Sequence, residues 1–165
     1  MRLFLLALGL MLIGVWLIIV FNYYFQLGGL KINWLLMFML VLTFRHSKLL
    51  LPFVGILAGL ICDALSHGIM GIYGISFFIT LLLVSQLNKL FYVNTLFTVS
   101  MGVFSMSIFE GWLSLSILDM LEPGINQSSL MLTSILPLAV LQGFMTPIIH
   151  KMVIGGENLF LREAA

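Results

Sequence analysis

The chain has 165 residues, of which 62% are hydrophobic and only 8% are charged. A soluble domain is about half apolar and about a quarter charged, so this composition excludes an ordinary soluble protein and indicates a membrane protein. The net charge of +1 argues against a nucleic-acid-binding protein, which would show a basic face, so no nucleic acid is expected as a partner. The single cysteine, Cys62, excludes an intrachain disulfide.

Six apolar runs follow one another along the chain. A bilayer core of about 30 Å needs about 20 apolar residues of helix, because backbone polar groups cannot stay unpaired in lipid. The expected spans are Leu3–Phe21, Leu30–Phe44, Leu49–Leu65, Ile69–Leu87, Thr95–Leu118 and Leu130–Ile149. No low-complexity linker separates them. We therefore expect residues 1–165 to form a single domain, an all-α integral membrane protein built as a compact bundle of six transmembrane helices.

Two ends of these runs carry clear stop signals. Pro123 and the glycine after it end the fifth run, since neither residue continues a helix. The last run contains Pro137 and Pro147, which predict a kink. His150 and Lys151 are predicted to end this run, and a tail to Ala165 follows.

The lysines and arginines predict the orientation. With the N-terminus inside, the cytoplasmic segments hold Arg2, Arg45, Lys48, Lys89, Lys151 and Arg162, and the outside segments hold Lys31. Positively charged residues gather in the cytoplasmic loops of membrane proteins. Both termini are therefore expected in the cytoplasm.

Asp63 is the first polar anomaly, because it stands near the outer end of the third span. There its carboxylate can accept hydrogen bonds from the backbone amides that begin the fourth span, where a negative charge is favoured. We prefer this structural interpretation, a cap that locks a helical hairpin, to a partner contact or an ion ligand, which stay open. His67 follows four residues later, but one histidine and one aspartate make an incomplete metal site, so no metal is expected.

Glycines surround Asp63 at helical spacings. Gly55 and Gly59 lie four residues apart, and Gly68, Gly71 and Gly74 recur every third residue. A phosphate-binding loop is rejected, because no strand precedes these glycines and no lysine follows them. We interpret the second set as a smooth stripe along one side of the fourth span, where a neighbouring backbone can approach closely.

Glu110 is the second anomaly, because it lies well inside the fifth span. Such a carboxyl group is expected to face the bundle interior or a partner, and no lysine or arginine stands at a matching depth. Protonation, a hydrogen bond to a serine or threonine, and pairing across an interface all stay open. The sequence has no Ser-His-Asp, Cys-His or paired-carboxylate arrangement, so we expect no catalytic residue, no cofactor and no enzyme activity.

The stretch from Gly59 to Gly71, G-L-I-C-D-A-L-S-H-G-I-M-G, resembles a motif of the rod-shape-determining protein MreD family. That family has a glycine, an aspartate four residues later, a small polar turn and a Leu-Gly pair opening the next helix. The matching residues here are Gly59, Asp63, Ser66, Gly68 and Gly71, and Met70 replaces the usual leucine. The length, the six-span layout and the basic loop after the second span also agree, so the resemblance covers essentially the whole chain.

This resemblance implies a non-enzymatic scaffold of the bacterial cell-elongation machinery in the inner membrane. It implies the bitopic protein MreC, the actin-like MreB filament, and RodA with its class B penicillin-binding transpeptidase as partners in sidewall peptidoglycan synthesis and rod shape, with membrane lipids around them. It also implies a fold like that of the membrane substrate-binding components of energy-coupling vitamin transporters. Asp63 and its glycines become folding or partner-contact residues, and Glu110 matches no family motif.

The alternative is a small solute-binding or transport membrane subunit. It requires an outward cavity lined by polar groups, which Asp63, His67 and Asn126 would supply. These groups are few, so the scaffold is the preferred interpretation.

Overall fold

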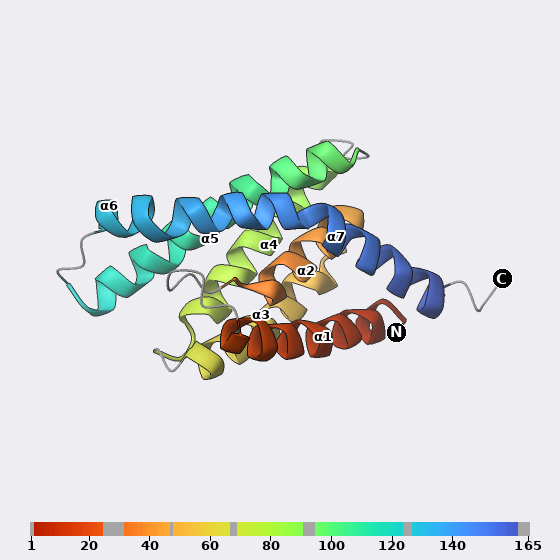
Figure 1. The fold of residues 1–165 in the computed structure, drawn as a ribbon, viewed down its shortest axis with the longest axis horizontal. Helices are drawn as coiled ribbons and strands as arrows, with labels where there is room; N and C mark the ends of the chain where they lie inside the picture. The colour runs from red at the N-terminus through yellow and green to blue at the C-terminus, as the bar shows by residue number, and fades with distance from the viewer. Residues whose placement is uncertain are drawn as a thin grey trace.

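The computed structural model describes residues 2–24, 32–46, 48–66, 69–90, 95–123 and 127–161, and every regular element within these ranges is helical (Figure 1). The elements are α1 (Arg2–Tyr24), α2 (Trp34–Arg45), α3 (Leu50–Ser66), α4 (Ile72–Leu90), α5 (Leu96–Leu121), α6 (Gln127–Leu130), the π-helical segment η1 (Met131–Ile135) and α7 (Leu136–Leu161). The last three follow one another without a break. The predicted all-α fold is confirmed for these ranges.

Four of the helical segments described are long and apolar enough to cross a membrane, namely α1, α4, α5 and the continuous segment of η1 and α7. The other two expected spans correspond to shorter apolar helices, α2 with 12 residues and α3 with 17. At 1.5 Å per residue, α2 is only about 18 Å long. The lengths and compositions therefore support a membrane protein with four clear spans and two shorter helices.

Large apolar side chains on the outside of the bundle support the same environment. Leu12 and Trp16 on α1, Phe97 on α5 and Phe144 on α7 are each more than half exposed. Large apolar side chains are unfavourable in water when many of them are exposed, whereas lipid tails cover them without cost.

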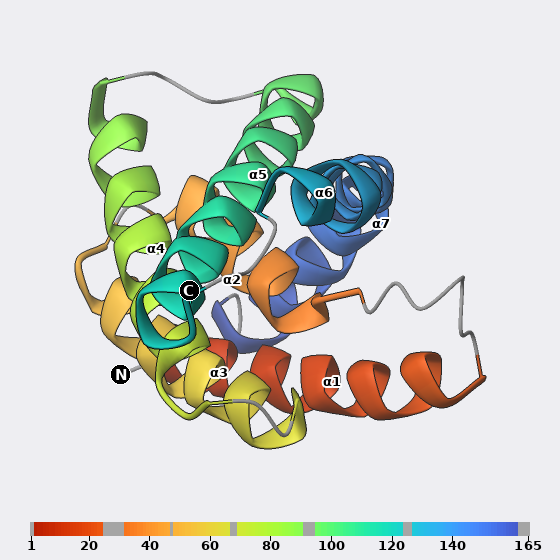
Figure 2. The ribbon, with the colours of Figure 1, turned by 90° about the vertical axis from the view of Figure 1, so that its left-hand side faces the viewer.

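Helix α2 is the core of the molecule. Every residue from Trp34 to Phe44 is buried, and α2 contacts α1, α3, α4, α5 and α7. Figure 2 shows α2 (orange) with the other helices arranged around it. A helix that is apolar all round is one enclosed by neighbours. The second apolar run of the sequence therefore forms a helix that is covered by protein.

Helices α3 and α4 form a tightly packed hairpin. The buried residues of α3 include Gly55, Ala58, Gly59 and Cys62, which recur at the three- and four-residue spacing of one helix face. A Cβ atom at Gly59 would overlap the carbonyl oxygen of Tyr73, and one at Gly55 would overlap the Leu81 side chain. These two glycines therefore set how closely α4 can approach.

Helix α7 continues beyond the end predicted at Ile149 and reaches Leu161. His150 and Lys151 lie inside the helix, so their interpretation as an end signal was wrong. Pro147 is also inside it, where a proline removes one backbone hydrogen bond, and Figure 1 shows α7 changing direction along its length. The reason for the extension is a contact far away in sequence, between Glu157 and the end of α2, described below.

The ends of the helices separate onto two sides of the molecule. In Figure 1, the start of α1 and the end of α7 lie toward the right, and the end of α1, the α3–α4 turn, the end of α5 and α6 lie toward the left. We call the left-hand side the hairpin side, because it carries the α3–α4 turn.

Candidate functional site

Asp63 lies at the start of α4 although it belongs to α3. Its carboxylate accepts hydrogen bonds from the backbone N–H groups of Gly71 (2.9 Å), Tyr73 (3.1 Å) and Gly74 (3.2 Å). The residue is 2% exposed. The first amides of a helix have no intrahelical acceptor and carry partial positive charge, so a carboxylate there is stabilised. The arrangement is the cap expected from the sequence.

The turn between the two helices depends on Gly71. Its φ angle of +104° lies in a region that residues with a Cβ rarely adopt. Gly71 precedes α4, which starts at Ile72, so it is a turn residue and not part of a glycine stripe along the helix. That predicted stripe was wrong, because a positive φ interrupts the helix before α4 begins. Gly74 is in α4, where its backbone lies against Gly59.

The remaining motif positions are Ser66, His67 and Gly68. The Ser66 hydroxyl donates a hydrogen bond of 3.1 Å to the carbonyl oxygen of Asp63, at the last turn of α3. His67 and Gly68 lie outside the described residues.

Glu110 lies on α5 and is 6% exposed. The hydroxyl of Ser76, on α4, stands 3.4 Å from its Oε1 atom. The same hydroxyl is 2.8 Å from the carbonyl oxygen of Ile72. A hydroxyl has one proton to donate, and the shorter contact is the better hydrogen bond. Glu110 is therefore a buried carboxyl group with weak support from the protein.

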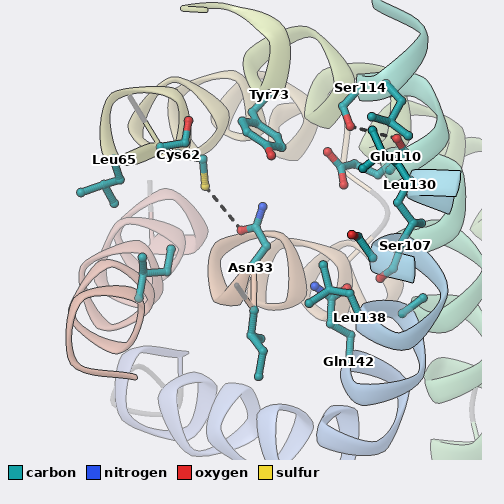
Figure 3. Close-up of a pocket in the computed structure, with 18 residues that line it drawn as sticks. Asn33, Cys62, Leu65, Tyr73, Ser107, Glu110, Ser114, Leu130, Leu138 and Gln142 are labelled. Atoms are coloured by element: carbon teal, nitrogen blue, oxygen red, sulfur yellow. Dashed lines mark hydrogen bonds between the residues drawn. The ribbon is translucent and has the colours of Figure 1, made fainter. Parts of the chain in front are cut away.

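A cavity of about 300 Å³ opens beside Glu110. Its lining comes from α1, α3, α4, α5, α6, η1 and α7 and from residues 32–33 just before α2. It includes the polar side chains of Asn33, Cys62, Tyr73, Ser107, Glu110 and Gln142. Figure 3 shows Tyr73 and Cys62 on one side of this space and Glu110, Ser107 and Gln142 on the other. Leu65 and Ser66 at the end of α3, with Leu130 at the end of α6, also line it, so the cavity extends toward the hairpin side.

The backbone around the cavity is irregular where it forms the wall. Ser134 and Ile135, at the end of the π-helical segment, line the cavity. A Cβ atom at Gly111 would lie 2.7 Å from Cγ2 of Ile135, so α5 and η1 approach closely beside Glu110. Single π-helical turns inside α-helices are frequent at functional sites.

Sequence reasoning missed most of this cavity. Asn33, Ser107 and Gln142 were not singled out, and Asp63 does not line the cavity. A signal was present on α5, where Ser107, Glu110, Gly111 and Ser114 recur at positions i, i+3, i+4 and i+7, the spacing of one helix face. The α7 residues that line the cavity could not be predicted from the local sequence, because their position depends on how α7 packs against α5.

A second polar cluster lies at the opposite end of α2. Arg45 donates two hydrogen bonds to Glu157, of 2.8 Å and 2.7 Å. His46 Nε2 lies 3.0 Å from Glu157 Oε1, and His150 Nε2 lies 3.4 Å from an Arg45 nitrogen. This bidentate pair joins the end of α2 to the last turns of α7. Both histidines therefore lie against the Arg45–Glu157 pair.

Within the described ranges, no three His, Cys, Asp or Glu residues lie together as a metal site requires. Cys62 is buried, and its thiol lies 3.4 Å from the Asn33 side-chain oxygen.

No protein-family model, curated protein or solved structure matches this chain at a significant level. The resemblance to the MreD family therefore rests on the motif from Gly59 to Gly71 and on the helix layout.

Proposed function

We propose that this protein is a non-enzymatic scaffold of the bacterial cell-elongation machinery. It spans the inner membrane six times with both termini in the cytoplasm. It binds MreC and, in the same assembly, works with the MreB filament and with RodA and its class B penicillin-binding transpeptidase, in support of sidewall peptidoglycan synthesis.

The observation that carries this proposal is that the motif residues hold α3 and α4 together. Asp63 binds the first amides of α4, and Gly59 allows the α4 backbone into contact. The motif thus builds a fixed hairpin. A scaffold needs such a rigid element, because a fixed surface binds a partner with less loss of conformational freedom.

The tip of the hairpin offers a docking surface. Ile69 and Met70, just before α4, are 39% and 71% exposed. Methionine side chains adapt to the shape of a partner, so we place the contact with MreC at this tip. Docking would favour one arrangement of the synthase assembly over another, since a ligand shifts an equilibrium by its difference in affinity for the two states.

The solute-transport alternative loses one of the three residues on which it depended. The Asp63 carboxylate points to the α4 amides and does not line the cavity. His67 lies outside the described residues, and so does Asn126.

The experiment that tests the scaffold is co-purification of MreC with the tagged protein in mild detergent, combined with depletion in rod-shaped cells. We expect MreC to be retained and the depleted cells to become round. If an added nutrient restored the rods, or if MreC were absent while a small molecule was bound, the transport alternative would replace this proposal.

A further inference from the structure

The cavity beside Glu110 contains hydrogen-bonding atoms that the described part of the protein leaves unpaired. The side chain of Gln142 is 1% exposed, and its Oε1 atom has no hydrogen-bond partner there. Ser107 is 6% exposed, and its Oγ atom is unpaired in the same way. Buried polar groups of native proteins are nearly always paired, so each exception requires an explanation.

Glu110 adds a third acceptor to the same space. Among the described residues, the Ser76 hydroxyl lies within hydrogen-bond distance of it, but that hydroxyl makes a shorter hydrogen bond to its own helix. Ser107 and Glu110 are three residues apart on α5, so they lie one above the other on one helix face. Figure 3 shows both, with Gln142 of α7, around the same space.

No cation of the lining compensates the carboxyl group. Among the described residues that line the cavity there is no lysine, arginine or histidine. Arg45, paired with Glu157 and with His46 beside it, belongs to the cluster at the other end of α2. An ionisable residue inside a membrane-spanning bundle is costly and normally has a partner, and the described lining residues offer Glu110 no cation.

We propose that this cavity binds the primary ammonium group of an amphiphilic amine. An ammonium group has three N–H donors and no acceptor, which matches the three acceptors offered by Glu110, Ser107 and Gln142. The Tyr73 ring also lines the cavity and suits a cation at its face. Ile18, Leu115 and Leu138 supply apolar wall for the rest of the ligand.

The size of the cavity limits the ligand. Its volume of about 300 Å³ is at the lower end of small-molecule sites. It therefore holds a small aromatic or aliphatic amine, or the headgroup of a phosphatidylethanolamine lipid whose chains remain in the bilayer. Both carry the same primary ammonium. This inference does not depend on the scaffold proposal, because MreC binding is placed at the hairpin tip.

Two experiments, a free-amine arm and a lipid arm, distinguish these two ligands. The free-amine arm measures binding to the full-length protein in detergent by isothermal titration calorimetry. The probe is phenethylamine, and its neutral counterpart is 2-phenylethanol, which has the same ring and chain without the cation. We expect saturable binding of one phenethylamine per protein, at least tenfold tighter than 2-phenylethanol. Glu110→Gln should weaken phenethylamine binding at least tenfold, whereas Glu122→Gln, at an exposed carboxylate, should not change it.

The lipid arm uses native mass spectrometry of the protein from nanodiscs. Phosphatidylethanolamine should be retained by the wild type and lost from Glu110→Gln. Phosphatidylcholine, whose quaternary ammonium has no N–H donor, should not be retained. Retained lipid without phenethylamine binding identifies the headgroup as the ligand, and saturable phenethylamine binding without retained lipid identifies a free amine.

Three outcomes would overturn the proposal. The first is equal binding of phenethylamine and 2-phenylethanol with no retained phosphatidylethanolamine. The second is no binding in either arm. The third is binding of phenethylamine or phosphatidylethanolamine that Glu110→Gln leaves intact. If Glu110→Gln does not fold, Gln142→Met replaces it, since it removes Oε1 at nearly constant size and should weaken ammonium binding at least threefold. The comparison of phenethylamine with 2-phenylethanol needs no variant. Continued co-purification of MreC would show that failure here leaves the scaffold proposal standing.

Discussion

Gly59 on α3 lies directly against the backbone of Tyr73 on α4, with no room for a side chain between them. A Cβ atom at Gly59 would overlap the Tyr73 carbonyl oxygen and lie 2.6 Å from Cα of Gly74. Close backbone approach at small residues is how membrane helices gain packing energy, since lipid gives them little hydrophobic drive to associate.

The first prediction follows from this contact. Gly59→Ala should lower the free energy of unfolding by about 1–3 kcal/mol, because the obstacle is backbone and not a movable side chain. The measurement is unfolding in mixed micelles. The matched control is Gly9→Ala on α1, where a new Cβ meets nothing within 4 Å. The control should be neutral or slightly stabilising, since alanine is the better helix former. Equal effects of the two variants would refute the close contact.

Gly71 presents the opposite case, with open space around it but a φ angle of +104°. Gly71→Ala should cost about 1–2 kcal/mol of unfolding free energy through backbone strain alone. Gly155→Ala serves as the comparison, because it also has open space and no positive φ. A Gly71→Ala variant as stable as Gly155→Ala would mean that the turn does not require the left-handed conformation.

Asp63→Asn should weaken the hairpin without removing it. Asparagine keeps one acceptor oxygen, but its NH₂ group would face the N–H donors that the carboxylate now binds. Replacing a charged acceptor at a helix N-terminus should cost about 1–3 kcal/mol of unfolding free energy. The measurement is the same unfolding titration, with Glu122→Gln as the control for removing an exposed carboxylate. If Asp63→Asn unfolded like the wild type but no longer retained MreC, Asp63 would instead be a partner contact.

The Arg45–Glu157 pair should show energetic coupling. A double-mutant cycle of Arg45→Gln and Glu157→Gln is expected to give about 1–2 kcal/mol, more than an exposed ion pair because Glu157 is largely buried and the pair is bidentate. Added salt should reduce the coupling. Arg45→Gln combined with Glu122→Gln should be additive. A coupling near zero would contradict the role of this pair in extending α7.

The parts of this structure that the sequence predicted are those set by local residues. Apolar runs predicted where helices lie, and the position of Asp63 near the end of α3 predicted that its carboxylate caps α4. The end of α7 was mistaken because Arg45 and Glu157 are 112 residues apart. The glycine stripe was mistaken because spacing does not reveal that Gly71 has a positive φ. The cavity was missed because it exists only where several helices meet.

The central claim is that the protein acts by contact between the hairpin tip and MreC. Site-specific photocrosslinking in growing cells tests it most directly, with the crosslinker at Met70 and, for comparison, at Phe144 on the exposed side of α7 and at buried Phe38. We predict a strong MreC adduct from Met70, a weaker one or none from Phe144, and none from Phe38. Adducts with lipid alone from both exposed positions would contradict the scaffold.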